Sequence, residues 1–550
     1  MTNTQDEINR LKAEIKKTEK ELEWYNDTYK NRKLIGIIKD RILIRFKFIE
    51  KLILLLKNNP YLFKSKSPSI LSEKIVCVIV NHNNNENAIK LRNNFSRYFD
   101  TIIIDSGSEI KDKTFICLEN VYYSGLLNNA YNYAKTNKYD FLLSICSDVI
   151  CENSEIDKMA LTLKKLDLTK IGVYSPSSSG RSHAYCKQGN NSGLRSVPFV
   201  EGFMFLADMN ILEKIFPVDL DINLYGWGLD VAKGYFCRKN NKLCLIDDSV
   251  NVYHPGDIGY STELAEVDMW KWINSFEDES FKTFYSNHID IIRKGQAGLN
   301  KVSVIIPCYN QALYLKETIF NVLLQEHGNI EIIIVDDGST DNTKEIALEY
   351  TSVFSNIKYF YKENGGLGDT RNKGLKNSTG DFIQFLDSDD LLSSNKIFSQ
   401  IYDFVEDRNV DISYSEYLCF EDGNKDKTWK YSRLILNNDP VLDFIKNWET
   451  ELSIPVHCFL FKKSTIENLY FDTELPNHED WDFHLKVASL SPKYKYQPNG
   501  IAYYRVRPTS MARDKELMIK GKKMCIKKAI DSNMFFGNYM DELKKRYAEN

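Results

Sequence analysis

The same succession of apolar runs, each ending in polar residues, occurs twice in this sequence, about 230 residues apart. Runs 74–80 and 101–104 lead into Asn81 and Asp105, and runs 302–306 and 330–335 lead into Asn310 and Asp337. Alternation of such buried runs with helical stretches is typical of parallel α/β sheets. Because the polar ends match as well as the runs, the repeat predicts two similar α/β domains in tandem.

A third apolar run in each copy ends in acids. In the second copy, residues 382–386 are followed by Asp387-Ser-Asp389-Asp390, and in the first copy residues 141–145 are followed by Cys146-Ser-Asp148. Parallel strands open at their carboxyl ends into the crevice where such sheets bind ligands. Clustered carboxylates repel one another, and their oxygen atoms suit Mg²⁺ or Mn²⁺ shared with a diphosphate. Alternatively, these acids belong to a solvated loop or cap the N-terminus of the next helix.

Length, charge and cysteine spacing exclude several classes of protein. A chain of 550 residues has room for roughly three to four domains. Its net charge of −4 argues against a general nucleic-acid binder. The eleven cysteines lack CxxC spacing and the N-terminus lacks a signal-peptide pattern, which favours the cytoplasm. No apolar run approaches the roughly 20 residues that cross a bilayer.

Two segments precede the repeat. Residues 1–29 carry a short heptad pattern, so residues 8–29 predict either a weak homo-oligomeric coiled coil or one amphipathic helix lying on its own protein. Residues 30–66 contain eleven Lys or Arg against two acids, interleaved with apolar residues. Such a helix can dock on an anionic membrane surface or pack on the next domain. We therefore expect segments at 1–29 and 30–70, α/β domains at 71–290 and 300–515, and C-terminal helices at 516–550.

The second copy resembles the family 2 glycosyltransferases of the GT-A fold. The resemblance rests on five motifs in the family's order: Val302-Ser-Val-Ile-Ile-Pro-Cys-Tyr-Asn310, Val335-Asp-Asp-Gly-Ser339, Asn364-Gly-Gly-Leu-Gly-Asp-Thr-Arg-Asn372, Phe385-Leu-Asp-Ser-Asp-Asp390 and Glu479-Asp-Trp-Asp482. The first copy is similar to a more divergent member, with Gly226-Trp-Gly-Leu-Asp230 and Tyr253-His-Pro-Gly256. The resemblance implies two Rossmann-like GT-A domains with mixed, mostly parallel sheets, as in bacterial enzymes that build capsule or O-antigen polysaccharides.

The resemblance also implies roles for residues of the second copy. Asp389 would ligate Mn²⁺ or Mg²⁺, Asp387 would face the ribose of a nucleotide-diphosphate sugar, expected to be a UDP-sugar, and Asp337 would contact its base. Asp480 would be the catalytic base, with Glu479 as helper. Pro307, Tyr309 and Asn310 would line the nucleotide pocket. A guanidinium matches phosphate geometry, so Arg371 is a candidate diphosphate or sugar contact, with a surface arginine as the alternative.

In the first copy, Asp148 would ligate the metal, His254 would be a further ligand and Asp230 the base, with Asn81 and Asp105 at the nucleotide. A structural histidine is the alternative for His254. Each copy departs from the pattern once. Cys146 stands where Asp387 stands, and a thiol lacks two acceptor oxygens. Arg507 stands where many relatives have a metal-binding histidine, so either Asp389 holds the metal mainly with the diphosphate or Arg507 contacts the diphosphate itself.

These observations predict a bifunctional inverting glycosyltransferase that uses nucleotide-sugar donors and a glycan or lipid-linked acceptor. It would be cytoplasmic and peripheral at the inner face of the bacterial membrane. One alternative keeps only the second domain catalytic and makes the first an acceptor-binding or scaffolding module. Another is a non-enzymatic, membrane-associated assembly protein.

Overall fold

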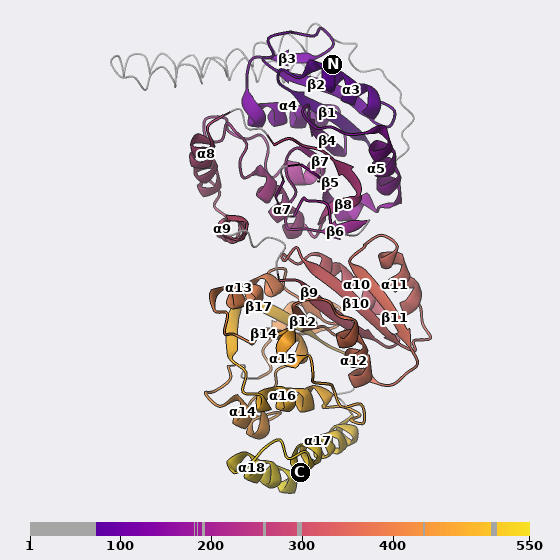
Figure 1. The fold of residues 1–550 in the computed structure, drawn as a ribbon, viewed down its shortest axis with the longest axis vertical. Coiled ribbons are helices and arrows are strands. Elements are labelled where there is room, and N and C mark those ends of the chain that lie inside the picture. The colour runs from indigo at the N-terminus through magenta and orange to yellow at the C-terminus, as the bar shows by residue number, and fades with distance from the viewer. Residues whose placement is uncertain are drawn as a thin grey trace, which may run out of the picture. The chain divides into compact units, whose positions relative to one another are not determined.

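The computed structural model describes residues 73–549, apart from 181, 184, 190–192, 257–259, 294–299, 433–434 and 508–513. The segments expected at 1–29 and 30–70 lie outside the described residues. The described chain separates into two compact units (Figure 1). The first holds the residues up to Gly189 and those of Phe199–Lys294, and the second holds those of Asn190–Pro198 and from Gly295 onward. The domain limits inferred from the sequence stay predictions.

The first unit is built on one mixed sheet. Within the unit its strands lie in the order β3-β2-β1-β4-β7-β5-β8. The strands are β1 (Ile75–Asn81), β2 (Asp100–Ser106), β3 (Ile116–Leu118), β4 (Phe141–Cys146), β5 (Ile171–Ser178), β7 (Met204–Asp208) and β8 (Leu243–Val252). The helices are α3 (Asn85–Phe95), α4 (Tyr122–Thr136), α5 (Asn153–Lys165), η1 (Leu168–Lys170), α6 (Met209–Leu212), α7 (Leu229–Lys239), α8 (Thr262–Asn274) and α9 (Glu279–Arg293).

The second unit is built on a second sheet, with order β11-β10-β9-β12-β16-β14-β17-β13 and β15 paired to β14. The strands are β9 (Val302–Cys308), β10 (Ile330–Asp337), β11 (Ile357–Lys362), β12 (Phe382–Phe385), β13 (Leu391–Leu392), β14 (Ile412–Glu421), β15 (Asn424–Trp429), β16 (Phe459–Lys462) and β17 (Tyr494–Val506). The helices are α10 (Ala312–Leu323), α11 (Thr343–Thr351), α12 (Leu367–Asn377), α13 (Lys396–Glu406), α14 (Pro440–Lys446), η2 (Val456–Cys458), α15 (Lys463–Ile466), α16 (Glu479–Ser489), α17 (Lys515–Asp531) and α18 (Asn538–Glu549). The short strand β6 (Leu194–Ser196) lies in the segment that groups with this unit.

Over seven strands the two sheets have the same order and the same strand directions. Strands β3, β2, β1 and β4 are mutually parallel, as are β11, β10, β9 and β12. The next strand, β7 or β16, is antiparallel to both of its neighbours, and the following pair, β5 with β8 or β14 with β17, is parallel again. The predicted α/β class, with two mixed and mostly parallel sheets in tandem, is confirmed.

Strand β12 is the centre of the second sheet, because β9 pairs with it on one side and β16 on the other. All four of its residues are buried. The polar member, Gln384, donates to the carbonyl of His457 at 2.8 Å and accepts from the buried Lys396. A strand covered on both faces reads as a continuous apolar run, which is why the sequence pattern located it.

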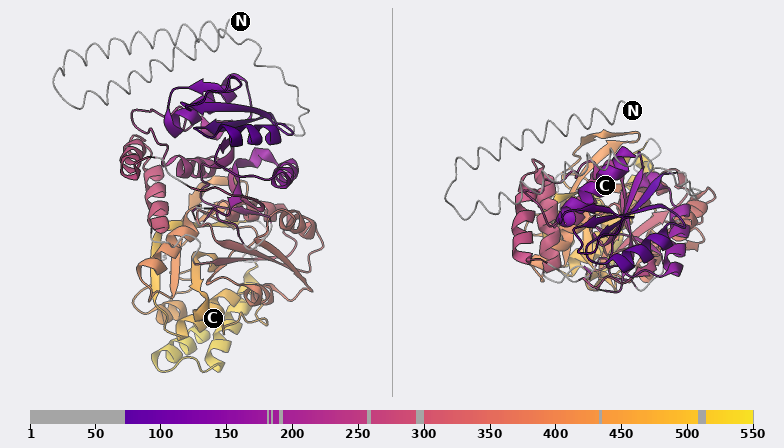
Figure 2. Two further views of the ribbon diagram at one scale, coloured as in Figure 1. Left: turned by 45° about the horizontal axis from the view of Figure 1, so that its top comes forward. Right: turned by 90° about the horizontal axis from the view of Figure 1, so that it is seen from above.

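The C-terminal helices α17 and α18, yellow in Figure 2, pack against each other. In addition, α17 contacts α16, and α18 contacts α14. Asp514 caps α17 by accepting from the backbone N–H of Leu517 at 3.0 Å. Among the described residues, no helix has the length and apolar character needed to cross a membrane.

Helix α12 lies close to the central sheet because it carries a glycine at the contact. A methyl group on Gly374 would meet Ile305 Cγ2 at 2.3 Å, and Ile305 is fully buried in β9. We therefore predict that Gly374→Ala lowers the free energy of unfolding by about 1–3 kcal/mol through overpacking, although alanine is the better helix former. Urea denaturation measures this. Lys373→Ala, on the exposed side of the same helix turn, is the control and is expected to change stability by less than about 0.5 kcal/mol.

Candidate active site

The acids of the second unit lie in a tight turn at the carboxyl end of β12. The backbone N–H of Asp390 donates to the carbonyl of Asp387 at 3.0 Å, and the hydroxyl of Thr318 in α10 donates to the carbonyl of Ser388 at 2.9 Å. Strand β13 follows at once. The turn therefore holds Asp387, Asp389 and Asp390 together at the edge of the sheet, as the sequence predicted.

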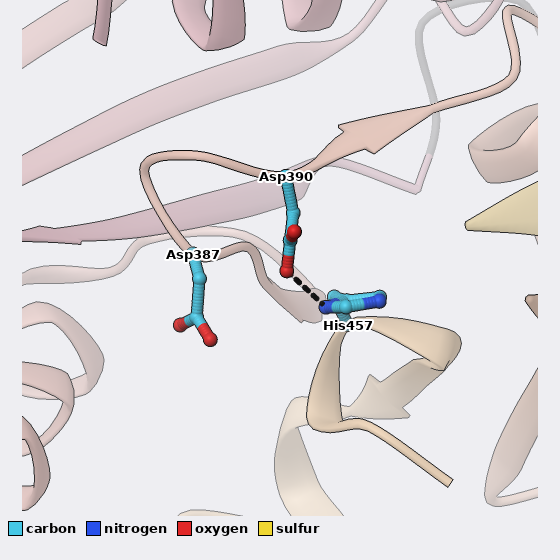
Figure 3. Close-up of side chains that lie close together, drawn as sticks. All are labelled: Asp387, Asp390 and His457. Atoms are coloured by element: carbon cyan, nitrogen blue, oxygen red, sulfur yellow. Dashed lines mark ion pairs between the residues drawn. The ribbon is translucent and has the colours of Figure 1, made fainter. Parts of the chain in front are cut away.

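Asp390 is directed toward His457 of η2 (Figure 3). Its Oδ2 lies 3.0 Å from His457 Nδ1, and its Oδ1 accepts from the backbone N–H of Arg505 at 2.7 Å. Asp390 is 2% exposed and His457 is fully buried. Donor atoms of Asp387, Asp390 and His457 lie within 4.8 Å of one another, a grouping that could hold a cation.

A buried arginine joins the strand end to helix α16. Arg371 of α12 donates to Asp387 Oδ1 at 2.8 Å and to Glu479 Oε1 at 2.6 Å, and its side chain is 2% exposed. Burial lowers the pKa of Arg371, but Asp387 and Glu479 together raise it above its ordinary value. For Asp387 the effects are reversed: burial raises the pKa of this carboxyl, and the charge of Arg371 brings it below its ordinary value. Arg371 is therefore not a surface residue, since it links two acids of the candidate site.

The predicted base and its helper begin helix α16. His478 precedes them with a left-handed backbone, φ +61°, and its Nε2 lies 2.9 Å from Glu449 Oε1. Burial raises the pKa of Glu479 and of Asp480 above their ordinary values, and Arg371 limits the rise. A carboxylate with a raised pKa is a stronger base once it is deprotonated. The local environment thus suits Asp480 to accept a proton.

Asp389, the residue that the resemblance assigns to the metal, is paired with an arginine. Arg507 donates to Asp389 Oδ2 at 2.7 Å, and Arg505 donates through Nε to the backbone carbonyl of Asp389 at 2.6 Å. Burial and the neighbouring Asp390 raise the pKa of Asp389 to about 7, against the lowering effect of Arg507. The guanidinium stands at the position where the family pattern places a histidine ligand.

The predicted nucleotide residues lie along the adjacent strands β9 and β10. Pro307 is buried within β9, whereas the side chain of Tyr309 is 52% exposed just beyond the strand. Asn310 Oδ1 accepts from the backbone N–H of Thr340 at 2.8 Å, which ties the loops after β9 and β10 together. Asp337 accepts from the backbone N–H groups of Gly365 and Gly366, both at 2.9 Å, and from Lys362. Their contacts with a nucleotide stay predictions.

The first unit brings Asp148 and His254 together. An antiparallel bridge between Ile150 and Tyr253 joins the end of β4 to the end of β8. As a result, His254 Nε2 lies 3.3 Å from Asp148 Oδ2, and the imidazole stacks on Phe203 with ring centroids 5.1 Å apart. Asp148 Oδ1 is buried without a hydrogen-bond partner in the described structure. A carboxylate with a spare oxygen beside an imidazole fits a divalent cation.

The second acid of the first unit has a cation beside it. Asp230 of α7 lies 2.9 Å from Nζ of Lys233, whose side chain is 1% exposed and lies over the ring of Phe205. Burial raises the pKa of the Cys146 thiol, which keeps it neutral where the second copy has the carboxylate of Asp387. The environments of the two predicted bases therefore differ.

The polar ends of β1 and β2 form one buried cluster. Asn81 Nδ2 donates to Asp105 Oδ1 at 2.7 Å, and Asp105 also accepts from the backbone N–H of Ser108 at 3.1 Å. Asn81 and Asp105 are at most 1% exposed. Their assignment to a nucleotide stays a prediction, and the contacts seen here hold the two strand ends together.

The fit to a divalent cation differs between the copies. Asp148 and His254 fit one, whereas at Asp389 the guanidinium of Arg507 takes the place of the expected histidine, and an arginine cannot ligate a cation. In the second unit, the ligands that the family resemblance implies, Asp389 with a histidine, therefore do not fit a divalent cation, because Arg507 stands in place of the histidine.

Three residues were missed by sequence reasoning. His457, Lys233 and Lys362 pair with Asp390, Asp230 and Asp337. Lys233 had a detectable signal, because it follows Asp230 by three residues on a predicted helix and such pairs face each other. His457 and Lys362 lie 67 and 25 residues from their partners along the sequence, so no local pattern could have located them.

Comparison with known proteins finds a family model that matches part of the second unit. Residues 303–469 match the family model described as glycosyl transferase family 2. The glycosyltransferase GlyA of Streptococcus pneumoniae serotype 4 is 32% identical over 225 residues, covering 39% of this chain and 32% of GlyA. The minor teichoic acid biosynthesis protein GgaB of Bacillus subtilis is 35% identical over 212 residues, covering 37% of this chain and 23% of GgaB.

Among solved structures, S. aureus TarS 1–349 in complex with UDP is similar at 22% identity and a TM-score of 0.34, covering 45% of this chain and 70% of that one. The chain spans less than two thirds of the length of the curated relatives it matches. The matched segment lies within the second unit and contains Asn310, Asp337 and Asp389. The second unit therefore carries a glycosyltransferase domain of family 2, as its motifs predicted.

Proposed function

We propose that the chain is a bifunctional inverting glycosyltransferase with one nucleotide-sugar site in each unit. One observation carries the proposal, namely that the two units place acids at equivalent points. Asp148 and Asp389 follow the fourth strand of each sheet, and Asp230 and Asp480 are the second residues of α7 and α16. Both helices begin after a residue with a left-handed backbone. Each unit thus has one acid after the fourth strand and another at the start of a helix.

Sugar transfer requires two things of the protein. The departing nucleoside diphosphate gains negative charge, which positive groups at the strand end stabilise. The acceptor hydroxyl must lose a proton, and Asp480 is the residue whose burial prepares it to take that proton. Direct attack by the hydroxyl on the opposite face from the diphosphate inverts the anomeric centre. When bound beside Asp148 and His254, Mn²⁺ or Mg²⁺ would add charge stabilisation for the diphosphate in the first unit.

A second candidate function keeps only the second unit catalytic, with the first as an acceptor-binding or scaffolding module. Three observations favour it. Lys233 pairs with Asp230 at 2.9 Å, so the carboxylate that would be the base already has a cationic partner. Cys146 replaces the carboxylate of the second copy with a neutral thiol. The match to the family model, which covers 303–469, also falls in the second unit.

A donor panel separates the two candidates. We expect Asp148→Asn and Asp389→Asn each to abolish transfer from a different nucleotide sugar, measured as product formed with Mn²⁺ present. Loss of transfer only in Asp389→Asn would assign catalysis to the second unit alone. If the purified protein binds no nucleoside diphosphate, the non-enzymatic assembly protein replaces both candidates.

The Arg371 bridge is predicted to maintain the site. Replacing the guanidinium with methionine leaves Asp387 and Glu479 without their partner, so we expect Arg371→Met to cost about 3–5 kcal/mol of unfolding free energy and to abolish transfer. Urea denaturation and a transfer assay measure the two effects. The matched control is Arg97→Met, which removes an ion pair with Asp157 on the surface and should cost less than about 1 kcal/mol. Equal losses in both variants would contradict the prediction.

The acceptor is proposed to be a growing bacterial surface glycan, carried on a lipid and reached from the cytoplasmic face of the membrane. Two features support this. GgaB, named for minor teichoic acid biosynthesis, is among the relatives. The segment 30–66 has a net charge of +9 in a chain of net −4, which suits an anionic lipid surface. Residues 8–29 are proposed to support self-association through their heptad pattern.

Vesicle binding tests the membrane proposal. We expect the full chain to co-sediment with liposomes that contain anionic phospholipid, and removal of residues 1–66 to abolish binding, because the removed segment carries the excess positive charge. Neutral phosphatidylcholine vesicles are the control. Unchanged binding after the truncation would place the membrane contact elsewhere.

A further inference from the structure

In each sheet, the strand at the seventh position is β8 or β17, and the strand at the fourth position is β4 or β12. A histidine or an arginine that follows the seventh strand lies beside an acid that follows the fourth. In the first unit the chain leaves β8 at Val252 and places His254 3.3 Å from Asp148. In the second unit it leaves β17 at Val506 and places Arg507 2.7 Å from Asp389. Because β8 and β17 hold equivalent positions, these two pairs are structural counterparts. At equivalent positions, the first unit therefore has His254, which can ligate a metal, and the second has Arg507, which carries a fixed positive charge.

Arg507 is held in place and remains accessible. Its NH2 donates to Asp389, its NH1 donates to Gln311 Oε1 at 3.3 Å, and its guanidinium lies over the ring of Tyr314 at 5.2 Å. The side chain is 19% exposed, whereas those of Arg371 and Arg505 are 2% and 3% exposed. Of these three arginines around the strand end, Arg507 is the one that a ligand can reach.

Arg505 is already committed to structure. Its guanidinium donates to Asp422 Oδ1 at 2.8 Å and to Glu317 Oε2 at 2.6 Å, in addition to the carbonyl of Asp389. It also lies over the rings of Tyr314 and Phe420. These contacts position the end of β17, while the next residue but one, Arg507, keeps part of its side chain exposed.

We propose that in the second unit the guanidinium of Arg507 takes the place of a divalent cation and binds the diphosphate of the nucleotide directly. The inference rests on the proposed function, since it assumes that a nucleoside diphosphate binds at this strand end. A guanidinium matches two phosphate oxygens with parallel hydrogen bonds and stays charged at all physiological pH values. Asp389 is then the residue that orients Arg507, and the second unit binds its nucleotide without added metal.

The grouping of Asp387, Asp390 and His457 is the competing location for a cation. Each carboxylate in it already has a partner, because Asp387 accepts from Arg371 and Asp390 accepts from the backbone N–H of Arg505. His457 and Asp390 are also almost wholly buried. This grouping supports the turn, and its use as a metal site is a defined outcome of the test below.

The test measures nucleotide binding rather than turnover. The full-length chain with Asp148→Asn, which disables the cation position of the first unit, is titrated with UDP and with GDP by calorimetry, in EDTA and in saturating Mn²⁺. Of UDP and GDP, we consider the one that binds with the higher affinity. We expect its dissociation constant for the second unit in EDTA to agree within about twofold with that in Mn²⁺. In the same background, Arg507→His is expected to weaken binding in EDTA by about tenfold or more and to regain it with Mn²⁺.

The controls make each outcome decisive. Arg507→Gln removes the charge without supplying a ligand, so its binding should be weak in both buffers. With Arg507 intact, an affinity for the nucleotide that is about tenfold lower in EDTA than in Mn²⁺ would overturn the proposal. If His457→Asn then abolished this dependence on Mn²⁺, the cation would be placed at the grouping of Asp387, Asp390 and His457. If wild-type protein binds neither UDP nor GDP in either buffer, the proposed function itself fails. The comparison with Arg507 intact does not depend on whether the Arg507 variants fold.

Discussion

The site of the second unit depends on one buried ion pair network, in which Arg371 spans Asp387 and Glu479. A guanidinium that is 2% exposed would be costly without full compensation, and two carboxylates provide it. Because Asp387 lies two residues after the end of β12 and Glu479 begins α16, the network fixes the distance between a strand end and a helix start. The base candidate Asp480 is the next residue of that helix. Its position is therefore set by packing and charge together.

The two units have acids at equivalent positions of the same fold, but different side chains lie beside these acids. At the strand end, Asp148 lies beside an imidazole and Asp389 beside a guanidinium. At the helix start, Asp230 lies beside the ammonium group of Lys233, whereas Asp480 follows a residue held by Arg371. A carboxylate's chemistry depends on the charge next to it, so equivalent acids in the two units need not do equivalent work.

The fold and the acids were predictable from the sequence because they leave local signals. Buried strands such as β9, β10 and β12 read as apolar runs, and the acids follow them directly. The partners leave no such signal. Arg371 and Glu479 are 108 residues apart and meet only through the folding of the sheet. The sequence placed Arg507 where a histidine was expected, but only the geometry could decide that it pairs with Asp389 rather than pointing away from it.

The charge balance around the strand end explains why this pairing matters. Asp387, Asp389, Asp390, Glu479 and Asp480 lie close together, and their mutual repulsion would oppose binding of a diphosphate. Arg371 and Arg505 offset part of this charge, but their side chains are 2% and 3% exposed. An anion can approach only if an accessible positive charge faces it. Among the described residues with an ion pair to these acids, Arg507 combines a permanent charge with exposure, and the proposed binding of a diphosphate rests on that combination.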